Sequence, residues 1–117
     1  MMGDIDLLNR LYDRFNARDM LALFATMHSN VSWANGMEGG HVHGHEEVRD
    51  YWTRQWSMID PHVQPKSFSS DPDGTVEVDV QQTVRDLKGG VLSERAVRHI
   101  FRIENGLIRR FDIGQAA

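Results

Sequence analysis

Residues 76–113 of the chain read VEVDVQQTVRDLKGGVLSERAVRHIFRIENGLIRRFDI. Apolar and polar residues alternate through much of this stretch, and the turn-forming pairs Gly89–Gly90 and Asn105–Gly106 divide it. Such alternation predicts strands with one buried face, and the glycine-containing pairs predict tight turns between them. The stretch therefore predicts three antiparallel strands in a meander. A run between Pro61 and the turn at residues 71–74 predicts a fourth strand ahead of them.

The register of these strands follows from the turns. If each pair is a two-residue loop, the first hairpin places Val80 opposite His99 and the second places His99 opposite Asp112. The face that holds these residues is mostly apolar, so we expect it to point inward. Opposed β-carbons lie only about 5 Å apart. The register therefore places the imidazole of His99 within hydrogen-bonding reach of the carboxylate of Asp112. A β-bulge in either strand would break this pair.

The chain ahead of these strands predicts three helices. Apolar residues recur at helical spacing over residues 5–15, 20–27 and 45–59. Between the second and third helices, Val31–Ala34 is typical of a short strand and residues 35–44 are typical of a glycine-rich loop. Helices followed by a meander predict an α+β fold, in which three N-terminal helices pack on a strongly curved, mainly antiparallel sheet.

Composition narrows the function classes. The 117 residues are 40% hydrophobic and 26% charged, which predicts one globular domain over residues 1–117. The net charge of −4 disfavours a nucleic-acid partner, and the absence of cysteine excludes disulfides, thiolate metal sites and a cysteine nucleophile. No apolar run approaches the ~20 residues of a membrane-spanning helix. The N-terminal residues do not resemble a secretory signal, so we expect a cytoplasmic protein without a membrane partner.

Several polar residues fall on the inward face of the predicted sheet, namely Gln82, Arg95, His99, Arg110 and Asp112. Their burial is costly unless they pair or line a cavity. We favour a cavity, in which Asp112 orients His99 for acid–base chemistry and Arg95 or Arg110 stabilises an enolate-like oxygen. The alternative is a core pair that only fixes the register, with both arginines reaching solvent.

An aromatic set would form the apolar wall of such a cavity, although most aromatic residues at helical and strand spacing belong to an ordinary core. Trp33 is the exception, because it ends the first strand beside the glycine-rich loop and is as well placed for a rim as for the core. The residues we expect to contact a ligand are Tyr12, Phe15, Trp33, Trp52, Trp56, Arg95, Phe101 and Arg110.

The run His41-Val42-His43-Gly44-His45 suggests a metal site, because alternate residues of an extended segment project to one side. No carboxylate can be assigned to orient these histidines, and a loop holds them poorly. We therefore expect neither a metal nor another cofactor.

The outward face of the last strands carries more apolar residues than exposure favours, and a homodimer through this face would cover them. They are Leu92, Ala96, Ile100, Leu107, Phe111 and Ile113.

Four segments in this order carry a resemblance to a known family. They are Asn16–Asp19 between two helices, Val31–Trp33, Gly44–Trp52 at the start of the third helix, and Phe101–Asp112 in the last hairpin. With these segments the chain resembles the NTF2-like superfamily, in particular its SnoaL-like and ketosteroid-isomerase-like members. The resemblance implies a cone-shaped α+β fold with an apolar cavity and frequent dimerisation.

The same resemblance bears on function, although members of this superfamily differ in activity. The ketosteroid isomerases use a tyrosine and two aspartates at positions that correspond to Leu11, Trp33 and His99, so their catalytic residues are not retained. SnoaL-type polyketide cyclases are similar in placing a histidine and an aspartate on the last strands, as His99 and Asp112 are placed. We expect a small apolar or aromatic carbonyl ligand and cofactor-free isomerase-type or cyclase-type chemistry. The alternative is a non-catalytic module for ligand binding or dimerisation.

Overall fold

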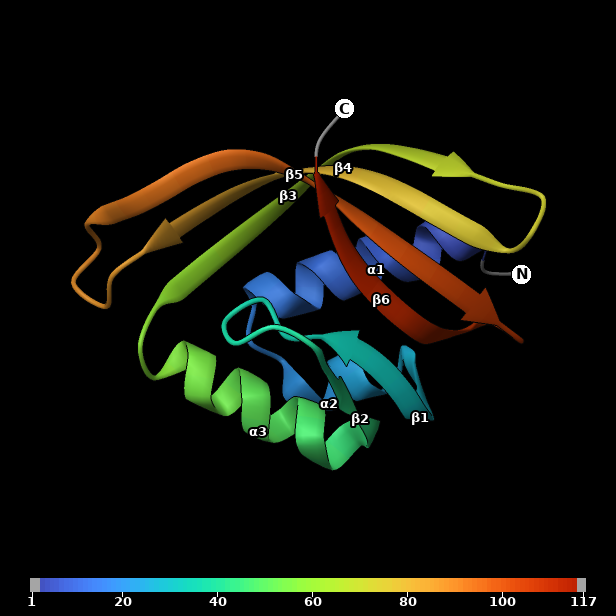
Figure 1. The fold of residues 1–117 in the computed structure, drawn as a ribbon, viewed down its shortest axis with the longest axis horizontal. Helices are drawn as coiled ribbons and strands as arrows, with labels where there is room; N and C mark the ends of the chain where they lie inside the picture. Colours follow the sequence, from blue (N-terminus) through green and yellow to red (C-terminus); the bar gives the residue numbers. More distant parts are fainter. Residues whose placement is uncertain (1–2, 116–117) are drawn as a thin grey trace.

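The computed structural model describes residues 3–115, which form three helices beneath an arched sheet of six strands (Figure 1). Within these residues, no helix is long and apolar enough to cross a membrane. The elements are α1 (Asp4–Asn16), α2 (Met20–Phe24), β1 (Met27–Ala34), β2 (His41–His43), α3 (Gly44–Trp56), β3 (Asp60–Ser70), β4 (Thr75–Arg85), β5 (Val91–Glu104) and β6 (Leu107–Gln115).

The sheet has the strand order β2-β1-β6-β5-β4-β3. Its neighbours pair antiparallel except β1 and β6, which run parallel. The predicted α+β fold, with helices packed on a curved and mainly antiparallel sheet, is confirmed (Figure 1). Some local predictions were wrong. The second helix ends at Phe24 instead of residue 27, and the third ends at Trp56 instead of residue 59. The first strand starts at Met27 instead of Val31, and part of the expected glycine-rich loop forms β2 against β1.

The turn between β4 and β5 is longer than predicted. The backbone N–H of Asp86 donates to the carbonyl of Gly90 over 2.8 Å, and the Asp86 carboxylate accepts hydrogen bonds from the backbone of Lys88 and Gly90. This turn moves the register by two residues, so His99 lies opposite Val78 and not Val80. Because side chains alternate with period two, the shift leaves the paired residues from Thr75 to Val84 and from Ser93 to Arg102 on their predicted faces.

A β-bulge changes the last hairpin. Ile103 pairs with Ile108, but Arg102 pairs with Arg110, so Arg109 is an extra residue in β6. The Arg109 guanidinium donates to the carbonyl of Asn30 in β1 over 2.6 Å. The bulge turns the following residues of β6 over.

As a consequence, the predicted pairing of His99 with Asp112 is wrong. His99 lies opposite Ile113, and Ile100 lies opposite Asp112. Phe111 points into the core with 4% of its surface exposed, whereas Arg110 is exposed. Phe111 and Ile113 therefore leave the outward apolar set, since Ile113 lines the cavity described below. A homodimer through the remaining residues of that face stays a prediction.

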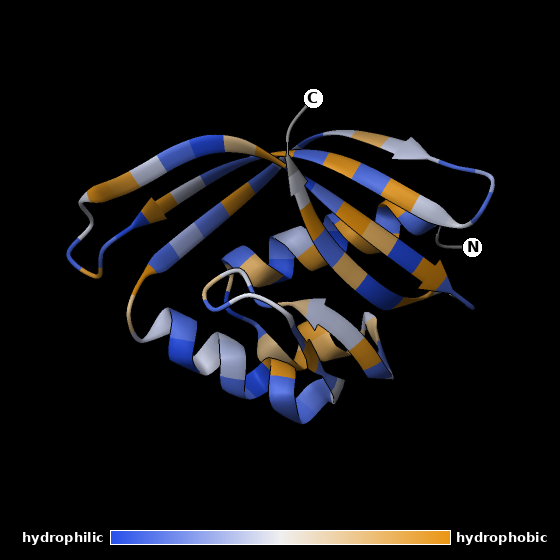
Figure 2. Cartoon of the chain, in the orientation of Figure 1, coloured by the Kyte–Doolittle hydropathy of each residue, from blue (hydrophilic) through white to orange (hydrophobic). Residues whose placement is uncertain are grey.

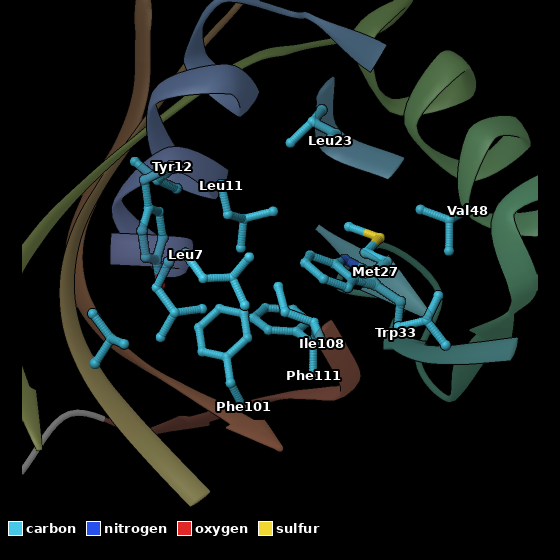
Figure 3. Close-up of a cluster of buried hydrophobic side chains, with 14 of the residues drawn as sticks. Leu7, Leu11, Tyr12, Leu23, Met27, Trp33, Val48, Phe101, Ile108 and Phe111 are labelled. Carbon is cyan, nitrogen blue, oxygen red and sulfur yellow. The ribbon is translucent and has the colours of Figure 1, made fainter. Parts of the chain in front are cut away.

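The core lies between the helices and the concave face of the sheet. Hydrophobic and hydrophilic bands alternate along the long strands, as one buried face requires (Figure 2). Side chains from the three helices and from β1, β3, β4, β5 and β6 meet in one cluster. Tyr12, Trp33, Phe101 and Phe111 are among its aromatic residues (Figure 3).

The end of α1 is tied to β3 through one side chain. The Asn16 amide donates to the carbonyl of Val63 over 2.8 Å and accepts from the backbone N–H of Val63 over 3.0 Å. These two bonds satisfy both backbone groups of Val63 and hold the helix against the strand. They hold α1 and β3 together on one side of a cavity that Val63 lines.

Candidate functional site

A cavity of about 520 Å³ lies between the helices and the concave face of the sheet. Its walls come from α1, α3, the loop after β1, and all six strands. Eight of the ten residues predicted to be catalytic or to contact a ligand line it: Tyr12, Phe15, Trp33, Trp52, Arg95, His99, Phe101 and Asp112.

Two other residues singled out from the sequence are not among the lining residues. Trp56 stacks on Trp52 with ring centroids 5.7 Å apart, and the guanidinium of Arg18 lies 4.9 Å from its ring centroid. Trp56 therefore supports the wall from behind. Arg110 is exposed because the bulge at Arg109 turns it away from the core.

The aromatic wall is tightly arranged. Trp33 stacks on Phe111 with centroids 4.1 Å apart and meets Trp52 edge-on at 5.3 Å. Phe101 lies 5.1 Å from Phe111 (Figure 3). Rings in these orientations form a rigid, largely apolar surface, which suits a flat apolar ligand.

The most buried polar contact of the cavity joins Tyr12 of α1 to His99 of β5. The Tyr12 hydroxyl and the His99 Nδ1 lie 2.8 Å apart, with only 3% and 6% of the two residues exposed. The phenol ring stacks on the imidazole, and Phe111 meets the imidazole edge-on at 4.8 Å. Sequence reasoning singled out both residues but assigned His99 a different partner.

Burial sets the protonation of this pair. It lowers the pKa of His99 to about 3 and raises the pKa of Tyr12 well above its ordinary value. Both side chains are therefore neutral at pH 7. Whichever of them donates the shared hydrogen, the pair keeps one N–H or O–H that can donate elsewhere. It can hydrogen-bond a carbonyl oxygen, but it accepts a proton poorly.

A second polar cluster joins Asp112 to His41 and Arg110. The Nε2 of His41 lies 2.8 Å from Oδ1 of Asp112, and the Nε of Arg110 donates to Oδ2 over 2.8 Å. Side-chain exposures of 25% for His41, 34% for Asp112 and 48% for Arg110 place this cluster near solvent. His41 and Asp112 are among the residues that line the cavity, and Asp112 lies opposite the outward-facing Ile100. The cluster therefore lies at the outer edge of the cavity.

The charge of Asp112 is stabilised by its neighbours. Partial burial alone would raise the pKa of this carboxyl, but hydrogen bonds from Arg110 and His41 outweigh burial and lower the pKa. Asp112 is thus a carboxylate at neutral pH. Sequence reasoning missed His41 as its partner because the contact depends on β2 and on the bulge in β6, which no sequence pattern reveals.

The three histidines of the 41–45 run have separate surroundings. His41 binds Asp112, His43 is exposed, and His45 stacks on Phe24 with its Nε2 3.3 Å from the carbonyl of Met27. Across residues 3–115, no three His, Cys, Asp or Glu side chains are grouped so that they could hold a metal ion.

The chain matches the family model of the SnoaL-like domain over residues 8–111. It therefore belongs to the SnoaL-like domain family, as its sequence motifs predicted. No match was found among curated proteins.

Solved structures share the fold. An NTF2-like protein of unknown function from Burkholderia pseudomallei superposes with a TM-score of 0.86 at 24% identity, over 99% of this chain and 92% of that one. TerC, co-crystallised with polyporic acid, superposes with a TM-score of 0.84 at 22% identity, over 96% of this chain and 90% of that one. A suggested polyketide cyclase from Sinorhizobium meliloti superposes with a TM-score of 0.80 at 21% identity, over 92% of this chain and 93% of that one. The NTF2-like cone predicted from the sequence is confirmed.

Proposed function

We propose that the protein binds a small, largely apolar or aromatic carbonyl compound in the cavity and moves a proton next to the carbonyl group without a cofactor. The observation that carries this proposal is the neutral Tyr12–His99 pair inside an aromatic cavity that also has a carboxylate, Asp112, at its outer edge. A hydrogen-bond donor and a base on one cavity are the two groups that enolisation requires.

Tyr12 and His99 act as the donor in this proposal. Their spare hydrogen binds the carbonyl oxygen and stabilises the negative charge that develops when a neighbouring C–H bond breaks. A buried neutral imidazole is suited to this role, because its pKa of about 3 makes it a poor proton acceptor. This assignment replaces the predicted dyad, in which His99 was paired with Asp112.

Asp112 is the base in this proposal. It is ionised, it lines the cavity, and His41 and Arg110 hold its two oxygens in place. A ligand that excludes water from this edge of the cavity would raise the basicity of this carboxylate, because desolvation disfavours the charged form. Arg95, which also lines the cavity, is a candidate for stabilising a ligand oxygen.

The relatives support a small-molecule ligand. One protein of the same fold is named as a suggested polyketide cyclase, and another was co-crystallised with polyporic acid. At 21% and 22% identity these likenesses extend to the fold, and the chemistry of the present cavity rests on its own residues.

The test uses 2-tetralone, an aromatic ketone with exchangeable hydrogens beside its carbonyl. Its binding is followed through the NMR signals of the His99 ring, assigned with His99→Gln, and its hydrogen–deuterium exchange is followed in D₂O. We expect 2-tetralone to shift the His99 signals and the protein to accelerate the exchange. Asp112→Asn is expected to slow the catalysed exchange by about 100-fold or more.

Two results would change this conclusion. Shifted His99 signals without accelerated exchange would support a non-catalytic binding module, in which Tyr12 and His99 only hold the ligand. Unchanged His99 signals with every aromatic ketone tested would contradict the proposal as a whole.

A further inference from the structure

A third polar site lies in the same cavity, on α3 and the loop after β1. The Tyr51 hydroxyl accepts a hydrogen bond from the backbone N–H of Gly36 over 3.0 Å and another from Nε2 of Gln55 over 3.2 Å. All three residues line the cavity, and Tyr51 is only 3% exposed. None of them belongs to the Tyr12–His99 pair or to the cluster around Asp112.

Hydrogen bonding at the Tyr51–Gln55 site is incomplete. Tyr51 accepts two hydrogen bonds, so its own O–H is free to donate to a third group. The Oε1 of Gln55 is buried and has no hydrogen-bond partner among residues 3–115. Burial raises the pKa of Tyr51, so its O–H keeps the hydrogen at neutral pH.

The conclusion does not depend on the orientation of the Gln55 amide. If the amide is turned over, Tyr51 donates to Oε1, and Nε2 then lacks a partner in place of Oε1. In both orientations the site keeps an unused hydrogen-bond donor, and the amide keeps a polar atom without a partner. A buried polar atom without a partner costs free energy, which a bound polar group can recover.

We propose that Tyr51 and Gln55 form a specificity subsite for a hydroxyl group on the ligand. A hydroxyl fits because it accepts from the spare donor and can donate to Oε1 of Gln55. The inference rests on the proposed function, since it adds a second oxygen to the carbonyl ligand already assigned to Tyr12 and His99. The ligand class becomes a hydroxylated aromatic ketone, bound by one oxygen at each of two polar sites.

The experiment compares two ketones that differ in one group of similar size, 6-hydroxy-2-tetralone and 6-methyl-2-tetralone. Dissociation constants are measured by calorimetry for the wild-type protein, Gln55→Leu and Tyr51→Phe. We expect the wild-type protein to bind the hydroxy ketone about tenfold more tightly than the methyl ketone. Both substitutions are expected to bring this ratio to one or below.

A matched control and a stability measurement complete the design. Gln64→Leu replaces an exposed glutamine of β3 and is expected to keep the wild-type ratio. Gln55→Leu is expected to leave the melting temperature unchanged, because the lost amide has an unpartnered atom. If Tyr51→Phe does not fold, Gln55→Leu and Gln55→Met carry the comparison.

The outcomes separate this inference from the proposed function. Equal affinity of the wild-type protein for both ketones, with 2-tetralone still bound at His99, would overturn the subsite and leave the proposed function standing. A lower melting temperature of Gln55→Leu with an unchanged affinity ratio would show that Gln55 is structural and would also overturn the subsite. If no tetralone binds, the proposed function fails, and the inference fails with it.

Discussion

Two polar centres, the Tyr12–His99 pair and the Asp112 cluster, differ mainly in burial. The pair is 3% and 6% exposed, and burial keeps both of its members neutral. The side chains of the cluster are between 25% and 48% exposed, and Asp112 stays charged beside His41 and Arg110. Burial thus changes the chemistry of a histidine. A buried histidine stays neutral and donates a hydrogen bond, whereas a solvated histidine can also accept a proton.

The difference also concerns stability. A buried hydrogen bond between α1 and β5 connects two layers of the fold, and the loss of either partner leaves a polar group buried without a partner. Ion pairs at a solvated edge contribute little, since water and salt screen them. The stability of the fold should therefore depend on the pair much more than on the cluster.

The largest expected effect is that of His99→Ala. The substitution leaves the Tyr12 hydroxyl without its partner and removes a ring packed between Tyr12 and Phe111. We expect the free energy of unfolding to fall by about 3 kcal/mol, measured by urea denaturation. His62→Ala, at an exposed histidine of β3, is the control and should change it by less than about 0.5 kcal/mol. Similar losses in both variants would show that the pair does not stabilise the fold.

The next effect is a pH dependence that belongs to His99. Its pKa is about 3 in the folded protein and about 6.5 when unfolded, so the unfolded state takes up a proton first as the pH falls. The contribution of neutral His99 is therefore complete above pH 6.5 and is lost progressively below it. Between pH 6 and pH 5, the wild-type protein should lose about 1 kcal/mol more than His99→Gln.

Urea denaturation of both proteins at each pH checks this prediction, and the variant subtracts the contribution of the carboxylates. Equal losses in the two proteins would mean that His99 titrates normally and is open to water. The contrast between a buried pair and a solvated cluster would then be wrong.

The sequence predicted the fold because its signals are local. Alternation along β4 and β5 and the turn at Asn105–Gly106 are enough for a meander. The register error at the 86–90 turn was even over most of the β4–β5 pairing, so His99 and its neighbours in β5 kept their face. Helical spacing of apolar residues in the first half of the chain predicted the three helices that pack beneath the sheet. None of these inferences required a contact between distant segments.

The hydrogen-bond partner of Asp112 could not be predicted, because it depends on one extra residue in β6, Arg109. The bulge at Arg109 is held by the carbonyl of Asn30, about eighty positions away along the chain, and the β6 sequence carries no sign of it. It turns Phe111 inward and moves Asp112 from His99 to His41. Residue types at the site were therefore predicted better than their pairings.

The smallest expected effect on stability is that of Asp112→Asn, and it separates the two centres most sharply. The amide keeps the shape of the carboxylate but loses the charge that Arg110 and His41 stabilise. Because these side chains are partly exposed, the loss should be about 0.5 kcal/mol and should disappear in 1 M salt. The loss in His99→Ala should persist in the same salt, since a buried neutral contact is not screened. A salt-independent loss of several kcal/mol in Asp112→Asn would make the cluster a structural element, and a slower tetralone exchange in that variant could then no longer be assigned to a missing base.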